Sequence, residues 1–74
     1  MARPKLIEEL HEAWYDLLFA SEGAGESRKH YNKVRDRCCE KYNASIDELI
    51  RAVRKDFAAW IRENDLPKPP PKDP

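Results

Sequence analysis

Glycine, methionine and long hydrophobic stretches are scarce in this sequence. Its 74 residues include two glycines and one methionine. No apolar run approaches the roughly 18–20 residues that a membrane-spanning helix needs. Gly23 and Gly25 follow no strand-like segment, so they do not form the glycine-rich loop that binds phosphate in nucleotide-binding proteins. The first residues lack the apolar core of a secretory signal, and the sequence therefore predicts a cytoplasmic protein without a membrane partner.

Only two cysteines are present, and they are neighbours, Cys38 and Cys39. Adjacent Cα atoms lie about 3.8 Å apart, which is closer than in an ordinary disulfide, and a helix would direct the two side chains apart. The pair therefore cannot join distant parts of the fold, and we expect reduced thiols in a reducing compartment. Cys39 lies off the apolar stripe of its segment, which favours a reactive thiol or a dimer contact.

The chain has no net formal charge, but its acidic and basic residues are concentrated in different segments. Fourteen basic side chains balance fourteen acidic ones. Residues 1–27 carry six carboxylates against two basic side chains, whereas residues 28–62 carry ten basic side chains against five acidic ones. Such segregation is typical of a dipolar surface that offers different faces to different partners.

Residues 4–21 have the pattern of an amphipathic helix. Pro4 suits a first helical turn, and Gly23 and Gly25 are expected to end the helix and form the following loop. Apolar side chains recur at helical spacing and predict one broad buried stripe. They are Leu6, Ile7, Leu10, Ala13, Trp14, Leu17 and Leu18.

Two further helices are predicted over residues 26–42 and 46–64. The first has a thin apolar stripe of Tyr31, Val34, Cys38 and Tyr42. The second begins with a capping box, in which Ser45 is followed three residues later by Glu48. Its apolar face is richer. That face comprises Ile46, Leu49, Ile50, Val53, Phe57, Trp60 and Ile61.

These segments predict an all-α fold, a small three-helix bundle over residues 1–65 with a disordered proline-rich tail over 66–74. The first and third helices should supply most of the core, with Trp14, Phe57 and Trp60 inside it. A chain this short buries a small core, so dimerisation would add stability. The tail contains a pattern read by SH3-type grooves, although a solvated extension is the favoured interpretation. The pattern is Pro67, Pro70 and Lys72.

Catalytic chemistry has little support in the sequence. His30 and Cys39 are nine residues apart, which is about 13 Å along a helix and too far for a hydrogen bond. His11 lies between Glu8, Glu12 and Tyr15 at helix-neighbour spacing, which would suit a weak metal site, but one histidine and two carboxylates recur by chance on exposed helix faces. We therefore expect a protein that is not an enzyme, with no catalytic residue, metal site or cofactor.

The charged rows are the candidate binding surfaces. A first row of carboxylates every four residues should face solvent opposite the apolar stripe, with two aromatic residues at its edge. This acidic face is Glu8, Glu12, Asp16, Tyr15 and Phe19. Basic rows follow on the next two helices. They are Lys29, Lys33, Arg37 and Lys41, then Arg51, Arg54, Lys55 and Arg62. Solvated faces without a partner are the simplest alternative interpretation.

The favoured function is a non-catalytic protein-binding module, such as an adaptor, inhibitor or accessory regulator. Its oppositely charged faces would hold another protein, or a second copy of the chain. The alternative is a nucleic-acid-binding regulator that uses the basic rows. Against it stand a pI near 6.7 and the acidic start of the third helix, at Asp47 and Glu48, where phosphates would be repelled.

Overall fold

The computed structural model describes residues 3–20 and 25–69. These residues form three helices: α1 (Lys5–Phe19), α2 (Gly25–Tyr42) and α3 (Ile46–Glu63). The described residues contain no strand. The predicted all-α three-helix bundle is therefore confirmed. The predictions that concern Gly23, Pro70 and Lys72 lie outside the described residues.

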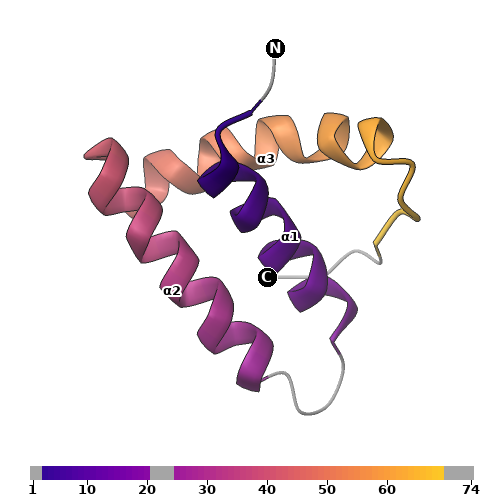
Figure 1. The fold of residues 1–74 in the computed structure, drawn as a ribbon, viewed down its shortest axis with the longest axis horizontal. Coiled ribbons are helices and arrows are strands. Elements are labelled where there is room, and N and C mark those ends of the chain that lie inside the picture. The colour runs from indigo at the N-terminus through magenta and orange to yellow at the C-terminus, as the bar shows by residue number, and fades with distance from the viewer. Residues whose placement is uncertain (1–2, 21–24, 70–74) are drawn as a thin grey trace.

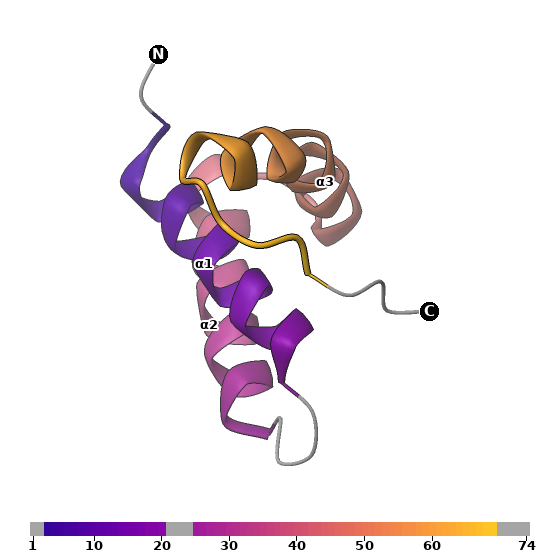
Figure 2. The same cartoon turned by 90° about the vertical axis from the view of Figure 1, so that its right-hand side faces the viewer.

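The three helices form an antiparallel pair crossed at one end by the third (Figure 1). α1 packs along the length of α2, and α3 lies across the end that holds the start of α1 and the end of α2 (Figures 1 and 2). α2 and α3 then diverge from the turn that joins them. The C-terminal half of α3 therefore extends away from α2, beside α1.

α1 is shorter than the sequence predicts. Pro4 precedes it with φ −56°, and the Pro4 carbonyl accepts hydrogen bonds from the amides of Ile7 and Glu8. The helix ends at Phe19, since Ala20 is extended. Gly25 is the first residue of α2, so its predicted place in the loop is wrong by one position.

Both α2 and α3 end with a non-glycine residue in the left-handed region. Asn43 (φ 51°) follows α2, and the amide of Ala44 donates to the Cys39 carbonyl at 3.1 Å. Asp65 (φ 53°) follows α3, in a Schellman motif in which the amide of Leu66 donates to the Ile61 carbonyl at 3.1 Å. These endings stop each helix sharply and redirect the chain.

The start of α3 confirms the predicted cap. Ser45 is extended, and its hydroxyl accepts a hydrogen bond from the amide of Glu48 at 3.2 Å. One of the unsatisfied amides of the first helical turn is thereby paired.

Replacing Ser45 with alanine should lower the free energy of unfolding by about 1 kcal/mol, because the Glu48 amide loses this acceptor. Urea denaturation followed by helical circular dichroism measures the change. Ser45→Asp is the matched variant, because aspartate also caps and should keep the stability within about 0.5 kcal/mol. Equal midpoints for the alanine and aspartate variants would contradict the capping role.

The core lies where the three helices meet. Its central cluster contains Leu10, Val34, Cys38, Leu49 and Val53, and the buried set is drawn mainly from α1 and α3. Cys38 is fully buried and its thiol donates to the Leu6 carbonyl at 3.7 Å. Burial raises the pKa of this thiol, so it acts as an apolar core group.

Several predicted core residues lie nearer the surface. Trp14 and Phe57 are only half-buried, whereas Trp60 is buried as predicted. Ile46 and Tyr42 are exposed by 43% and 39% because they flank the α2–α3 turn, where the helices begin to diverge. The crossing of α3 over one end of the helix pair leaves the other end partly uncovered.

Candidate partner-binding groove

A groove opens where α3 diverges from the helix pair. Its floor is the C-terminal half of α1, and its walls are the N-terminal half of α2 and the C-terminal half of α3. It encloses about 1600 Å³. Apolar and aromatic side chains form most of the floor and inner walls. They are Trp14, Leu17, Leu18, Tyr31, Phe57, Ala58 and Ile61.

Contacts between aromatic rings connect the floor of the groove to its walls. The rings of Trp14 on α1 and Tyr31 on α2 are 5.3 Å apart, in a tilted arrangement. The ring of Phe57 on α3 lies 5.8 Å from the ring of His11 on α1, also in a tilted arrangement. Trp14, Tyr31 and Phe57 are all half-buried, so each supports its helix contact and also presents part of a ring to the groove.

The rim of the groove is cationic. Five basic side chains and one carboxylate, Asp65, are among the described residues that line it. The basic ones are Arg28, Arg35, Arg54, Arg62 and Lys68. Burial raises the pKa of Tyr31, while the positive charges of Arg35 and Arg54 oppose that rise. Cations from two different helices therefore act on the same hydroxyl group.

The start of the tail forms part of the groove wall. The Tyr15 hydroxyl donates a hydrogen bond to the Pro67 carbonyl at 2.7 Å. Together with the Schellman motif, this bond directs residues 66–69 back beside α1 (Figure 2), where Leu66, Lys68 and Pro69 line the groove. The tail was predicted to be disordered from residue 66, but this part of it is attached to α1.

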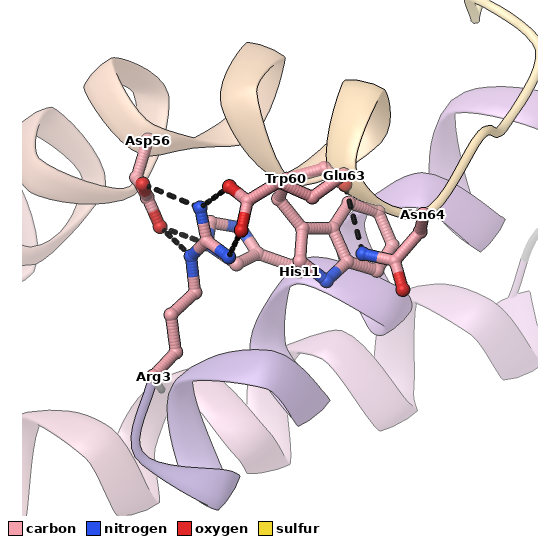
Figure 3. A network of polar contacts seen from close by, with 6 residues as sticks. All are labelled: Arg3, His11, Asp56, Trp60, Glu63 and Asn64. Carbon is pink, nitrogen blue, oxygen red and sulfur yellow. Dashed lines mark hydrogen bonds and ion pairs between the residues drawn. The ribbon is translucent and has the colours of Figure 1, made fainter. Parts of the chain in front are cut away.

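A charged network joins the segment before α1, and His11 of α1, to α3 (Figure 3). The guanidinium of Arg3 donates to both oxygens of Asp56, with Nη2 at 2.8 Å from Oδ1, and to both oxygens of Glu63 at 3.1 and 2.6 Å. Hydrogen bonds from Arg3 lower the pKa of Asp56 to about 2 and lower that of Glu63. The same bonds raise the pKa of Arg3.

His11 belongs to this network, and its predicted place on an exposed face is wrong. The side chain is fully buried, its Nε2 lies 3.1 Å from Oδ2 of Asp56, and its ring stacks 5.4 Å from Trp60. Burial lowers the pKa of His11, although Asp56 opposes this effect. A neutral ring that donates from Nε2–H fits this pairing. Nδ1 is buried without a hydrogen-bond partner among the described residues.

The predicted acidic face is displayed to solvent. Glu8, Glu12 and Asp16 are all exposed, and none of them lines the groove. Phe19 is exposed by 48%. Tyr15 is half-buried, since its ring packs against Phe19 (4.7 Å) and against aromatic rings of α3.

Only part of the predicted basic rows lies at the groove. All eight side chains are exposed. Only Arg54 and Arg62 line the groove. The others lie outside it, namely Lys29, Lys33, Arg37, Lys41, Arg51 and Lys55.

The sequence interpretation missed three groove cations, Arg28, Arg35 and Lys68. A usable signal was present, because Arg28, Tyr31 and Arg35 follow the three- and four-residue spacing of one helix face.

Reactive groups are not gathered at the groove. Among the described residues, no cluster of three or more His, Cys, Asp or Glu side chains lies close enough to hold a metal ion. Cys39 is half-buried and packs against the core cluster, so it is closer to the core than its place on the helix suggested. No helix in the described ranges is long and apolar enough to cross a membrane.

Comparison with protein-family models, with curated proteins and with solved structures found no match to this chain. The function is therefore argued from the chain's own residues.

Proposed function

We propose that this chain is a non-catalytic protein-binding module whose main contact surface is the groove between α1, α2 and α3. The observation that carries the proposal is an apolar floor surrounded by cations. Trp14 and Tyr31 present aromatic surface to the groove, and the arginines surround it. Tryptophan, tyrosine and arginine are the residues that most often dominate binding energy at protein interfaces.

The size of the groove also favours a macromolecular partner. Pockets for small ligands commonly enclose about 300–1,000 Å³ and bury most of the ligand, whereas this groove has a volume of about 1600 Å³ and is partly open to solvent. The acidic face of α1 would be available to a separate, basic part of the partner. The mechanism is occupancy without turnover, and a second copy of the chain is one candidate for the charged faces.

A nucleic-acid partner is less well supported. The first turn of α3 carries Asp47 and Glu48, which are both exposed and would repel a phosphate backbone at the end of the helix that usually enters the major groove.

Affinity capture with the immobilised full chain and two charge-reversed variants tests the proposal. The groove variant is Arg54→Glu with Arg62→Glu, and the row variant is Lys33→Glu with Arg37→Glu, which reverses the same number of charges outside the groove. We expect the unmodified chain to capture a protein from the native cell. The amount captured should fall at least about tenfold with the groove variant and should stay the same with the row variant.

Lys5→Glu provides a control, because this exposed residue belongs to none of the charged surfaces. Nuclease treatment before capture separates protein partners from those bridged by nucleic acid. Equal capture by the unmodified chain and the groove variant would reject the groove as the binding surface. If the unmodified chain retards DNA or RNA in a gel shift and the groove variant does not, the nucleic-acid alternative replaces the proposed function.

A further inference from the structure

We infer that the occupant of the groove is an acidic amphipathic α-helix of a partner protein, which lies along α1 as a fourth helix between α2 and α3. This inference rests on the proposed function and specifies its partner. Helices bind in grooves of this kind by inserting apolar residues at positions i, i+3, i+4 and i+7, while their flanks meet the rim.

The charge of the rim selects an acidic partner. Four arginines and one lysine surround the apolar floor, and Asp65 is the one carboxylate among the described lining residues. A basic helix would bring like charges together at every edge, which costs affinity and also slows association. Arginine favours carboxylate partners because its planar guanidinium can form two parallel hydrogen bonds with a carboxylate.

The spacing of the arginines matches the repeat of a helix. Arg28 and Arg35 lie seven residues apart on α2, which corresponds to about 10.5 Å along the helix axis. Arg54 and Arg62 lie eight residues apart on α3, or about 12 Å. Carboxylates at positions i and i+7 of a bound helix repeat at about 10.5 Å. Each wall can therefore pair with acidic residues two turns apart, with Arg35 exchanging its present ion pair to Asp36 (3.1 Å) for a carboxylate of the partner.

The floor offers matching apolar sites. Trp14, Leu17 and Leu18 follow an i, i+3, i+4 pattern on α1, and Phe57 and Ile61 follow an i, i+4 pattern on α3. These side chains line a continuous groove between two helices. Interdigitation of an incoming helix with two such rows is the packing used in helical bundles. Among residues 3–20 and 25–69, no further helix lies where α2 and α3 diverge, and the tail residues Leu66, Lys68 and Pro69 line that space.

Synthetic peptides test the inference directly on the full chain. The probe is a peptide of about 18 residues, long enough to form a helix, with leucines at i, i+3, i+4 and i+7 and glutamates on both flanks. One control replaces every glutamate with lysine, and another shuffles the order so that the apolar face is lost. Calorimetric titration should show the acidic peptide binding at least about tenfold more tightly than either control. Its affinity should fall as sodium chloride is raised.

A matched pair of variants assigns the binding to the groove. Arg54→Glu should weaken the acidic peptide by about tenfold, whereas Lys5→Glu, the same kind of charge reversal on an exposed residue outside the groove, should leave its affinity unchanged. Circular dichroism of both variants verifies that the helices are retained. Arg62→Glu gives a second, independent variant on the same wall.

Several outcomes would overturn the inference. Equal affinity for the acidic and lysine peptides, or no effect of Arg54→Glu, would remove the acidic helix as the occupant. Preferential binding of anionic phosphatidylglycerol vesicles or of a short RNA would show that the basic rim binds phosphate groups instead. If sedimentation shows a dimer that Arg54→Glu converts to a monomer, a second copy of the chain occupies the groove. If capture then still yields a groove-dependent protein partner, the proposed function stands and only its acidic helix is rejected.

Discussion

Replacing Trp60 with alanine is expected to lower the free energy of unfolding by about 3–5 kcal/mol. Trp60 is exposed by only 4% and packs against His11 (5.4 Å), Phe57 (5.8 Å) and Tyr15 (5.9 Å). Removing the indole leaves a cavity between α1 and α3 that these rings cannot fill without moving. Small domains are stabilised by roughly 5–15 kcal/mol, with short chains at the lower end. The variant should therefore be largely unfolded.

Urea denaturation followed by far-ultraviolet circular dichroism measures this effect. Phe19→Ala is the matched control, because Phe19 is also aromatic and on a helix but is exposed by 48%, so its loss should cost less than about 1 kcal/mol. Trp60→Phe should fall between the two, since a ring remains in the cavity. A Trp60→Ala midpoint within experimental error of the unmodified chain would show that α3 is not anchored on α1 by this residue.

Acidification from pH 7 to pH 5 is expected to destabilise the chain through His11. Burial lowers the pKa of His11 in the folded state, whereas the unfolded side chain titrates near 6.5. Below that value the unfolded chain binds a proton that the folded chain does not, so the free energy of unfolding rises with pH and falls on acidification. The slope approaches about 1.4 kcal/mol per pH unit where the two states differ by one proton.

The groups that face His11 set the limits of this effect. Asp56 favours its protonated form, and Arg3 opposes it. Asp56 itself has its pKa lowered to about 2 from the model-peptide value of 3.8, so its own contribution is present above pH 3.8 and is lost as the pH falls toward 2. The window from pH 7 to pH 5 is therefore governed by His11, and a second decline from Asp56 follows below about pH 4.

Denaturation midpoints between pH 7 and pH 5 test this expectation. His11→Leu should remove most of the slope, and His30→Gln, at an exposed histidine, should keep it. Proton magnetic resonance of the two imidazole rings offers a second measurement if the leucine variant fails to fold. A His11 ring that becomes charged at the pH of an unfolded peptide would contradict a lowered pKa.

The helices could be predicted from the sequence because their signals are local. Pro4 and the Ser45 cap mark helix starts through contacts within four residues, and the structure confirms both starts to within one residue. The end of α1 was placed too late, because the glycines after it suggested a longer helix. The structure shows instead that the chain becomes extended at Ala20.

The burial of His11 could not be predicted from local signals, because its partner is distant in sequence. His11 lies four residues after Ile7 and three before Trp14, so its spacing permitted a buried position. Its polarity argued for solvent. Only the approach of Asp56, which is 45 residues away, supplies the hydrogen bond that makes burial tolerable.

The groove could not be predicted from helix patterns taken one at a time. Arg54 and Arg62 were recognised as exposed cations, but their relation to Arg28 and Arg35 depends on how α3 crosses the helix pair. A helical wheel gives the direction of a side chain around its own axis and contains no crossing angle. The exposure of the charged rows was therefore predicted correctly. The groove, which brings some of these residues together, depends on tertiary packing.

The manner in which α3 is attached has a consequence for the order of folding. α1 and α2 form a local pair joined by a short connection, whereas Arg3 contacts Asp56 and Glu63 across 53 and 60 residues of sequence. Contacts of such separation close long loops and form after local ones. α3 is thus the helix expected to dock last. Because α3 forms one wall of the groove, the groove is complete only once α3 has docked on the α1–α2 pair.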